Sequence, residues 1–198
     1  SYSTGLRYDN RNRAGAPLEA TRFSELGWRA DGLFSPTPHA IVEFGGDTER
    51  LDGRSTIVRH LPATDGQVTL NDYDEDTFAA SAYAQVRLAL GPRLSVVPGS
   101  RVDRWGLTGS TVASPWVNAE WRLSSHTRVR GGSGVYRQFP GLDEVYGTHG
   151  GGYGLQPGYA LHVDASVEHA WRYQTRVLFN LYTRHEKNML WTPGSEPR

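Results

Sequence analysis

The chain has 198 residues, enough for one domain of ordinary size with a core of its own. Its 21 basic and 21 acidic residues balance, and no run of Lys or Arg forms a basic patch, so nucleic acid is not an expected partner. The absence of cysteine excludes disulfides, thiolate metal sites and a cysteine nucleophile. No stretch approaches the run of about 20 apolar residues that a membrane-spanning helix needs. A transmembrane β-barrel stays open, because only every second residue of its strands faces lipid.

Apolar and polar residues alternate along most of the chain, which is the period of a β-strand. The pattern is clear in residues 77–90, 94–105, 114–123 and 160–170, and weaker in 23–34, 40–48 and 175–184. The first residues, 2–9, have the composition of a further strand. The sequence therefore predicts an all-β fold of about nine strands, an antiparallel up-and-down meander with no helix longer than a turn or two.

The predicted connections alternate in length. Residues 35–39, 91–93, 124–126 and 172–174 have the length and composition of tight turns. At the other end of the predicted strands, the connections at 10–21, 50–76 and 139–159 are long and polar, and only the connection at 107–111 is short. Short turns at one end and long loops at the other are the layout of an outer-membrane barrel with periplasmic turns and extracellular loops.

The two faces of the predicted strands differ in chemistry. One face mixes charges with bulky aromatics and glycines, which suits a wet lumen, whereas the other is rich in Ala, Val and Leu with aromatics toward the strand ends. We expect the outward face to carry Ala82, Val86, Leu88, Val96, Val117, Trp121, Val129, Val163, Val167 and Phe179. We expect the concave face to carry Arg87, Arg101, Asp103, Glu120, Arg128, Arg130 and Glu168. Periodicity alone also allows a soluble barrel with the two faces exchanged.

Three patterns have an alternative chemical interpretation. Asp72, Asp74 and Asp76 alternate in a way that could surround Ca²⁺, but the glycine and the distal Glu of an EF-hand loop are missing, so a solvated acidic loop is favoured. The serine of "GGSGV" lies within a strand rather than at a strand-to-helix turn, which disfavours hydrolase chemistry. "GGGYG" precedes no predicted helix and is not a phosphate-binding loop. No catalytic residue, metal site or cofactor is predicted.

Three stretches resemble the C-terminal barrel of TonB-dependent outer-membrane receptors. They are "LSVVPGSRVDRW", "SPWVNAEWRLSSHTRVRGGSGVYRQFP" and "YGLQPGYALHVDASVEHAW", in the family's order and each at a strand boundary. Gly158 departs from the pattern, in which Glu is frequent. The resemblance implies the bacterial outer membrane, contact with outer-membrane lipid, and no enzymatic activity.

The family's barrels have about 22 strands around a plug, and this chain offers about nine. We therefore expect residues 1–198 to form a single barrel segment without plug, coupling segment, signal peptide or closing strand. The resemblance implies coupling to the TonB system through the missing N-terminal region.

The resemblance also implies uptake of a scarce small ligand such as a metal chelate, a vitamin or a glycan. The alternative is a small self-contained or soluble β-barrel that binds a small apolar ligand, or a cavity hydrolase. A receptor's ligand meets the extracellular loops and the upper lumen, where aromatic faces and a few polar groups can orient it. The predicted ligand-binding residues are Arg104, Trp105, Tyr136, Gln138, Asp143, Glu144, Tyr146 and His149.

Overall fold

The computed structural model describes residues 2–3, 7–11, 17–61, 66–146, 152–171 and 175–188. Its strands are β1 (Tyr2–Ser3), β2 (Arg7–Arg11), β3 (Pro17–Thr37), β4 (Ala40–Leu61), β5 (Gly66–Ala89), β6 (Leu94–Trp105), β7 (Ser110–Arg122), β8 (Thr127–Gln138), β9 (Gly158–Ala170) and β10 (Arg176–Lys187). Two short helical segments, α1 (Leu142–Tyr146) and the 3₁₀ turn η1 (Gly152–Gly154), lie between β8 and β9. Among the described residues, no helix is long and apolar enough to cross a membrane.

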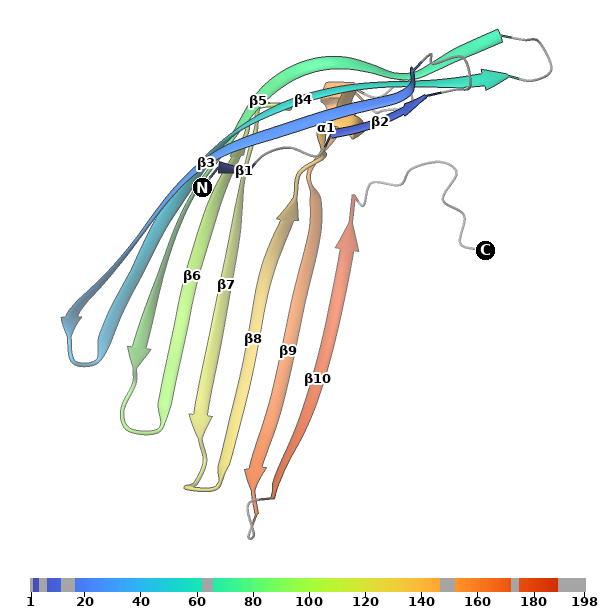
Figure 1. Ribbon diagram of the computed structural model, residues 1–198. Helices are drawn as coiled ribbons and strands as arrows, with labels where there is room; N and C mark the ends of the chain where they lie inside the picture. Colours follow the sequence, from blue (N-terminus) through green and yellow to red (C-terminus); the bar gives the residue numbers. More distant parts are fainter. Residues whose placement is uncertain are drawn as a thin grey trace.

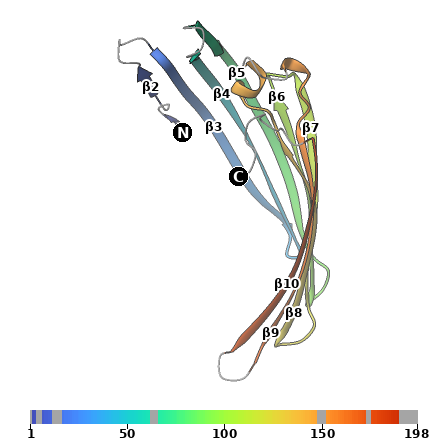
Figure 2. The same ribbon diagram turned by 90° about the vertical axis from the view of Figure 1, so that its right-hand side faces the viewer.

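The strands form one curved antiparallel sheet, in which β3 to β10 pair in sequence order (Figure 1). Both β1 and β2 pair with β3, so they extend the sheet beyond the meander without pairing to each other. Figure 2 shows the curvature of the sheet from the side of β10. The predicted all-β meander with helix limited to a turn or two is confirmed.

The tight turns gather at one end of the sheet, and α1 lies at the other end (Figure 1). Residues 38–39 connect β3 to β4, and bends at 91–93 and 124–126 connect the next two hairpins. The fourth predicted turn, 172–174, lies outside the described residues. Because connected strands share these turns, distance along a strand from its turn measures height above that end of the sheet.

Two predicted loops are wrong in extent. Of residues 10–21, Asn10 and Arg11 belong to β2 and residues 17–21 belong to β3. Residues 50–76 do not form a long loop, because β4 runs to Leu61 and β5 begins at Gly66. The polar residues of this hairpin are held in register by cross-strand pairs, including Arg50 with Asp76 at 3.1 Å and Arg54 with Asp74 at 3.4 Å. Opposite charges on facing strands stabilise pairing without an apolar face. The segment therefore extends the sheet beyond the apolar part of β3, β4 and β5.

A small hydrophobic core lies on the polar face of the sheet, at the end opposite the turns. Its buried members are Leu51, Trp105, Leu107, Leu142 and Val145. An added Cβ at Gly53 would lie 2.5 Å from Cδ1 of Leu142, so the glycine lets α1 approach the backbone of β4. Two apolar residues of α1 thus anchor the connection between β8 and β9 to strands far away in the sequence.

Candidate functional site

The outer face of the sheet is apolar and exposed. Trp28, Phe179 and Leu181 keep 65%, 60% and 61% of their surface accessible. The outward residues predicted from sequence share this face, as the register shows for Val96 opposite Ala119, Val117 opposite Ser133, and Val129 opposite Val167. Large exposed apolar surfaces of this extent need an apolar environment. We refer to this surface as the outer face.

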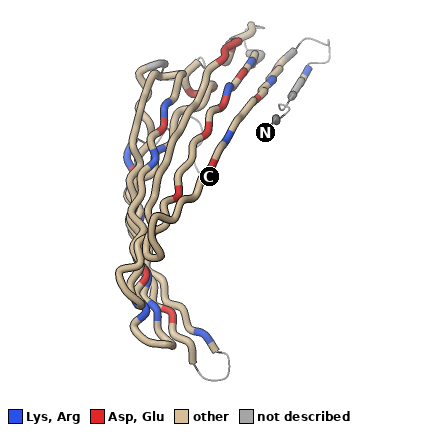
Figure 3. Tube along the Cα trace, turned by 90° about the vertical axis from the view of Figure 1, so that its left-hand side faces the viewer, with Lys and Arg blue, Asp and Glu red and all other residues tan. Residues whose placement is uncertain are grey.

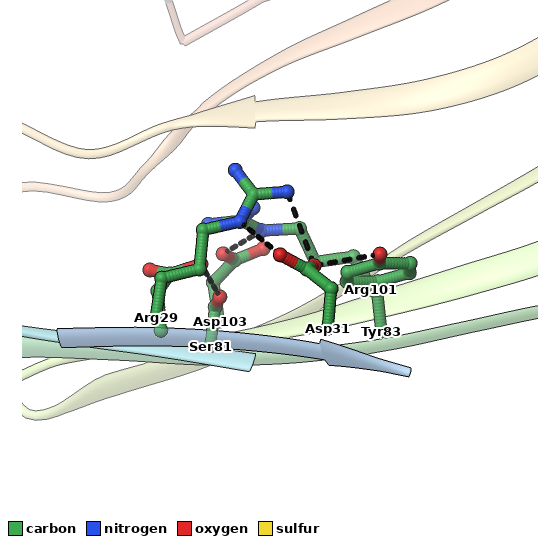
Figure 4. A network of polar contacts seen from close by, with 7 residues as sticks. Arg29, Asp31, Ser81, Tyr83, Arg101 and Asp103 are labelled. Atoms are coloured by element: carbon green, nitrogen blue, oxygen red, sulfur yellow. Dashed lines mark hydrogen bonds and ion pairs between the residues drawn. The ribbon is translucent and has the colours of Figure 1, made fainter. Parts of the chain in front are cut away.

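The opposite face of the same strands carries the charged residues, and Figure 4 shows its side chains rising toward the later strands of the curved sheet. This is the concave face, as predicted for Arg101, Asp103, Arg130 and the other charges named above. Figure 3 shows charges of both signs interspersed along the strands. The assignment of faces made from the sequence is therefore confirmed.

One polar network spans β3 to β6 on the concave face (Figure 4). Asp31 accepts hydrogen bonds from Arg29 Nε and from the Tyr83 hydroxyl, both at 2.8 Å. Arg101 lies 2.5 Å from Asp103 and 3.5 Å from Asp47, and the Asp47 carboxylate also accepts a hydrogen bond from Ser81 at 2.5 Å. The charges are thus paired in chains across four strands.

A second network lies nearer the turns. Arg130 bridges Glu120 at 2.8 Å and Glu168 at 3.1 Å, and Arg176 reaches Glu168 at 3.2 Å. A hollow of about 580 Å³ adjoins these side chains and is also lined by Asp164. Each strand from β7 to β10 contributes a charge, so this part of the concave face is also polar.

Glycines make room for bulky groups between the two networks. An added Cβ at Gly99 would lie 2.5 Å from the ring of Trp116, whose indole Nε1–H is donated to Gln85 at 3.3 Å. At Gly134 the same atom would lie 3.1 Å from Trp116. A Cβ added at Gly132 would contact the side chains of Asn118 and Asp164. The missing side chains at Gly99, Gly132 and Gly134 therefore leave room for larger neighbours on the concave face.

The segment 139–146 covers the concave face at the end opposite the turns. The indole Nε1–H of Trp105 is donated to the Pro140 carbonyl oxygen at 3.0 Å. The Gly141 amide donates to the Glu144 carboxylate at 2.7 Å. Tyr73 lies with its ring centroid 5.9 Å from that of Tyr146. Burial, with a smaller contribution from the negative charge of Asp143, raises the pKa of the Tyr73 phenol above its ordinary value.

The predicted ligand-binding residues fall into three places. Trp105, Asp143, Glu144 and Tyr146 come together around α1, although Trp105 is buried and its donor is used. Tyr136 and Gln138 lie on the concave face of β8 and are exposed. Arg104 lies on the outer face, with Nη1 3.5 Å from the Thr111 hydroxyl. His149 lies outside the described residues.

Sequence reasoning missed two residues beside Tyr136. The His162 ring of β9 lies 4.6 Å from the Tyr136 ring and 5.7 Å from the Tyr182 ring of β10, by centroid distance. Tyr136 and Tyr182 are 53% and 62% exposed. The buried Nε2 atom of His162 has no hydrogen-bond partner among the described residues. We call Tyr136, His162 and Tyr182 the aromatic cluster. The alternation of β9 and β10 places these side chains on the polar face, but their proximity depends on register.

No group of three or more metal-ligating side chains occurs in the part of the chain that the structure describes. Asp72, Asp74 and Asp76 belong to β5 and not to a loop. Alternate residues of an extended strand stand about 7 Å apart, so they cannot surround one ion. Asp74 and Asp76 are also paired with arginines of β4.

A curved antiparallel sheet with an exposed apolar outer face and a polar, ion-paired concave face defines a segment of a transmembrane β-barrel. Residues 1–190 match the family described as TonB dependent receptor-like, beta-barrel. The chain belongs to the TonB-dependent receptor family, whose members reside in the bacterial outer membrane and are transporters rather than enzymes.

Solved receptor structures share the fold. A variant of the ferric enterobactin receptor PfeA from Pseudomonas aeruginosa superposes with a TM-score of 0.72 at 14% identity, covering 89% of this chain and 28% of that one. The siderophore receptor PirA from Acinetobacter baumannii superposes with a TM-score of 0.67 at 13% identity, covering 85% of this chain and 27% of that one. The copper transporter OprC superposes with a TM-score of 0.64 at 15% identity, covering 87% of this chain and 31% of that one. The chain thus spans less than a third of these receptors' length. No curated protein matches the sequence.

Proposed function

We propose that residues 1–198 form one segment of a larger receptor barrel that takes up a metal chelate across the outer membrane, driven through the TonB system. The solved structures with this fold include siderophore receptors and a copper transporter. The names of these neighbours have the uptake of a metal in common, either as a siderophore complex or as copper. Among the ligands that the family resemblance implies, a metal chelate is the class that contains a metal.

The observation that carries the proposal is the aromatic cluster on the concave face. Two of its three rings are more than half exposed, although they lie on a face where most charges are paired. Flat aromatic faces with a polar group among them bind planar, partly polar ligands such as the aromatic arms of chelators. We assign the first ligand contacts to Tyr136, His162 and Tyr182, and retain Gln138, Asp143, Glu144, Tyr146 and His149 as the predicted contacts around them.

Two other predicted residues have a different role in this proposal. Trp105 supports the α1 segment, because its ring is buried and its indole donor is bound to Pro140. Arg104 lies on the outer face and is not assigned to the ligand.

The second candidate, a soluble barrel that encloses a small apolar ligand or a hydrolase site, requires the apolar face to be interior. The exposure of Trp28, Phe34 and Leu181 at 65%, 60% and 61% disfavours that arrangement.

The test replaces the cluster in the receptor that carries this segment. Tyr136→Ala and Tyr182→Ala are each expected to weaken the binding of a ferric chelate to intact cells roughly tenfold at equal surface expression, about 1.4 kcal/mol. Phe179→Ala, an aromatic deletion on the outer face of the same strand as Tyr182, is the matched control. Unchanged affinity in both tyrosine variants would leave these side chains with a purely structural role and refute the assignment.

A further inference from the structure

Three side-chain oxygens converge over two glycines of β8 on the concave face. Gly132 and Gly134 are alternate residues of the strand, so both face the same side of the sheet. A Cβ added at Gly134 would lie 3.4 Å from the hydroxyl oxygen of Tyr136. A Cβ added at Gly132 would lie 3.1 Å from Oδ1 of Asp164, and Oδ1 of Asn118 is closer still. We call Asn118, Tyr136 and Asp164 the oxygen cluster.

The oxygen cluster has unused capacity to accept hydrogen bonds. Among the described residues, no hydrogen bond or ion pair joins the side-chain oxygens of Asn118, Tyr136 and Asp164 to another group. Asn118 and Asp164 also line the hollow of about 580 Å³, so a small group can reach them. A carboxylate, an amide oxygen and a phenol oxygen together accept several hydrogen bonds and carry one negative charge. They therefore match a hydrogen-bond donor with a positive charge.

The neighbouring arginines do not neutralise this carboxylate. Arg130 lines the same hollow, but two glutamates hold it at 2.8 and 3.1 Å. Arg184 of β10 is bonded to Glu186. No described basic side chain lies within ion-pair distance of Asp164, so its charge is available to a ligand.

Aromatic faces lie beside the same carboxylate. Tyr182 is directly opposite Asp164 in register, and the Cβ atoms of such a pair lie about 5 Å apart. The rings of Tyr136 and Tyr182 are both more than half exposed, and tyrosine faces attract cations. The His162 ring contacts both tyrosines, and its buried Nε2 is a further acceptor when the imidazole is neutral.

The concave face farther from the turns also favours the approach of a cation. The register places Glu25, Glu49 and Glu75 on this face of β3, β4 and β5. Asp143 and Glu144 of α1 add charge of the same sign. Charges of one sign raise the local concentration of ligands of the opposite sign. A cationic ligand is therefore attracted toward the concave face, and an anionic one is repelled.

We propose that the oxygen cluster, with the Tyr182 ring beside it, binds a primary ammonium group. An ammonium group has three donors and no acceptor, so it can bond to the oxygens of Asn118, Tyr136 and Asp164 while it lies against a tyrosine face. This inference rests on the proposed function for the source of the group, which belongs to the transported metal chelate. The chelate is then one that carries a primary amine.

The first test needs no chelate. n-Butylammonium and n-butanol are titrated separately onto the receptor barrel that carries this chain, in a non-ionic detergent. Binding is followed by the fluorescence of Trp116, as the difference from Trp116→Phe, because Cβ of Trp116 lies 3.1 Å from the Cβ position of Gly134. We expect a saturable change with butylammonium and none with butanol.

Two variants assign the response to the cluster. Asp164→Asn is expected to weaken butylammonium binding about tenfold, because it removes the charge and keeps the size of the side chain. Glu75→Gln makes the same charge change on the concave face of β5 and is expected to leave binding within about twofold. The proposal is overturned if butylammonium gives no response, if butanol gives an equal one, or if the two variants have equal effects.

A second test separates this proposal from the proposed function. Ferrioxamine B, a ferric hydroxamate chelate with one primary amine, is compared with its N-acetyl derivative, in which the amine is an uncharged amide. Acetylation is expected to weaken binding to the unaltered receptor about tenfold, and Asp164→Asn is expected to remove the difference. Equal binding of the two chelates would overturn the recognition of an amine on the cargo. If butylammonium binds and neither chelate does, the ammonium site is supported and the result counts against the proposed function.

Discussion

Trp105 of β6 donates its indole N–H to the carbonyl oxygen of Pro140, 3.0 Å away and 35 residues later in the sequence. Its ring also stacks on Phe139, with ring centroids 5.7 Å apart. Pro140 is fully buried. The contact joins the end of β6 to the segment that follows β8, and it holds α1 against the concave face.

Trp105→Phe should loosen this segment. The variant keeps an aromatic ring for the stack but leaves a buried carbonyl without its donor, which costs about 1–3 kcal/mol. We expect faster amide hydrogen exchange in residues 141–146, with exchange in β9 unchanged. Trp121→Phe removes an exposed indole from the outer face and is the control. Equal exchange of residues 141–146 in both variants would contradict the role given to this hydrogen bond.

Gly99→Ala should disturb the middle of the concave face. The added methyl would lie 2.5 Å from the Trp116 ring, which must then move away from Gln85. Overpacking of this kind costs about 1–3 kcal/mol of unfolding free energy. Gly154→Ala is the matched control, because nothing lies within 4 Å of its added Cβ. Urea unfolding of the two variants measures the difference, and equal stabilities would show that Trp116 has room that the structure does not indicate.

Adjacent residues of β10 test the two faces directly. Leu181 is 61% exposed on the outer face, and Asn180 lies on the concave face opposite Ser166. Both are near the middle of the strand, so Leu181→Arg places a charge in the centre of the lipid band and should destabilise the membrane-inserted barrel by about 2–4 kcal/mol. Asn180→Arg should have a small effect, because its side chain enters a hydrated face. Folding titrations in lipid vesicles distinguish them, and a reversed order would invert the assignment of faces.

Tyr73 should give the α1 segment a pH dependence at high pH. Tyr73 lies beyond the apolar band, and burial followed by the charge of Asp143 raises the pKa of its phenol in the folded state. The neutral phenol is thus the form that the docked segment favours. Its contribution to stability is fully present below the unfolded pKa of about 10 and is lost as the pH rises through the higher folded value.

Hydrogen exchange of residues 141–146, referred to β9 at each pH, measures this effect. We expect the protection of this segment to fall more steeply above about pH 10 in the unaltered protein than in Tyr73→Phe, whose side chain cannot ionise. Identical profiles would show that α1 docks independently of the Tyr73 phenol.

Two properties of the molecule follow from local sequence. Apolar and polar residues alternate over most of β6 and β9, and alternation assigns each side chain to a face regardless of the partner strand. Charge on one face and aliphatic residues on the other therefore predicted both the strands and the polar concave side. Short turns need few residues of particular types, so 91–93 and 124–126 were also predictable from local sequence.

The tertiary structure decided the extent of β5, the aromatic cluster and the packing of α1, because residues far apart in the sequence stabilise each of them. The run containing Asp74 and Asp76 is typical of a loop when considered alone. It extends β5 because Arg54 lies opposite Asp74 and Arg50 reaches Asp76 diagonally across the two strands. The aromatic cluster depends on the registers of β8 with β9 and of β9 with β10, which bring together residues 26 and 20 positions apart. Leu142 likewise has no local periodicity that predicts its burial in the cluster with Leu51, since the cluster forms only where α1 lies against the sheet.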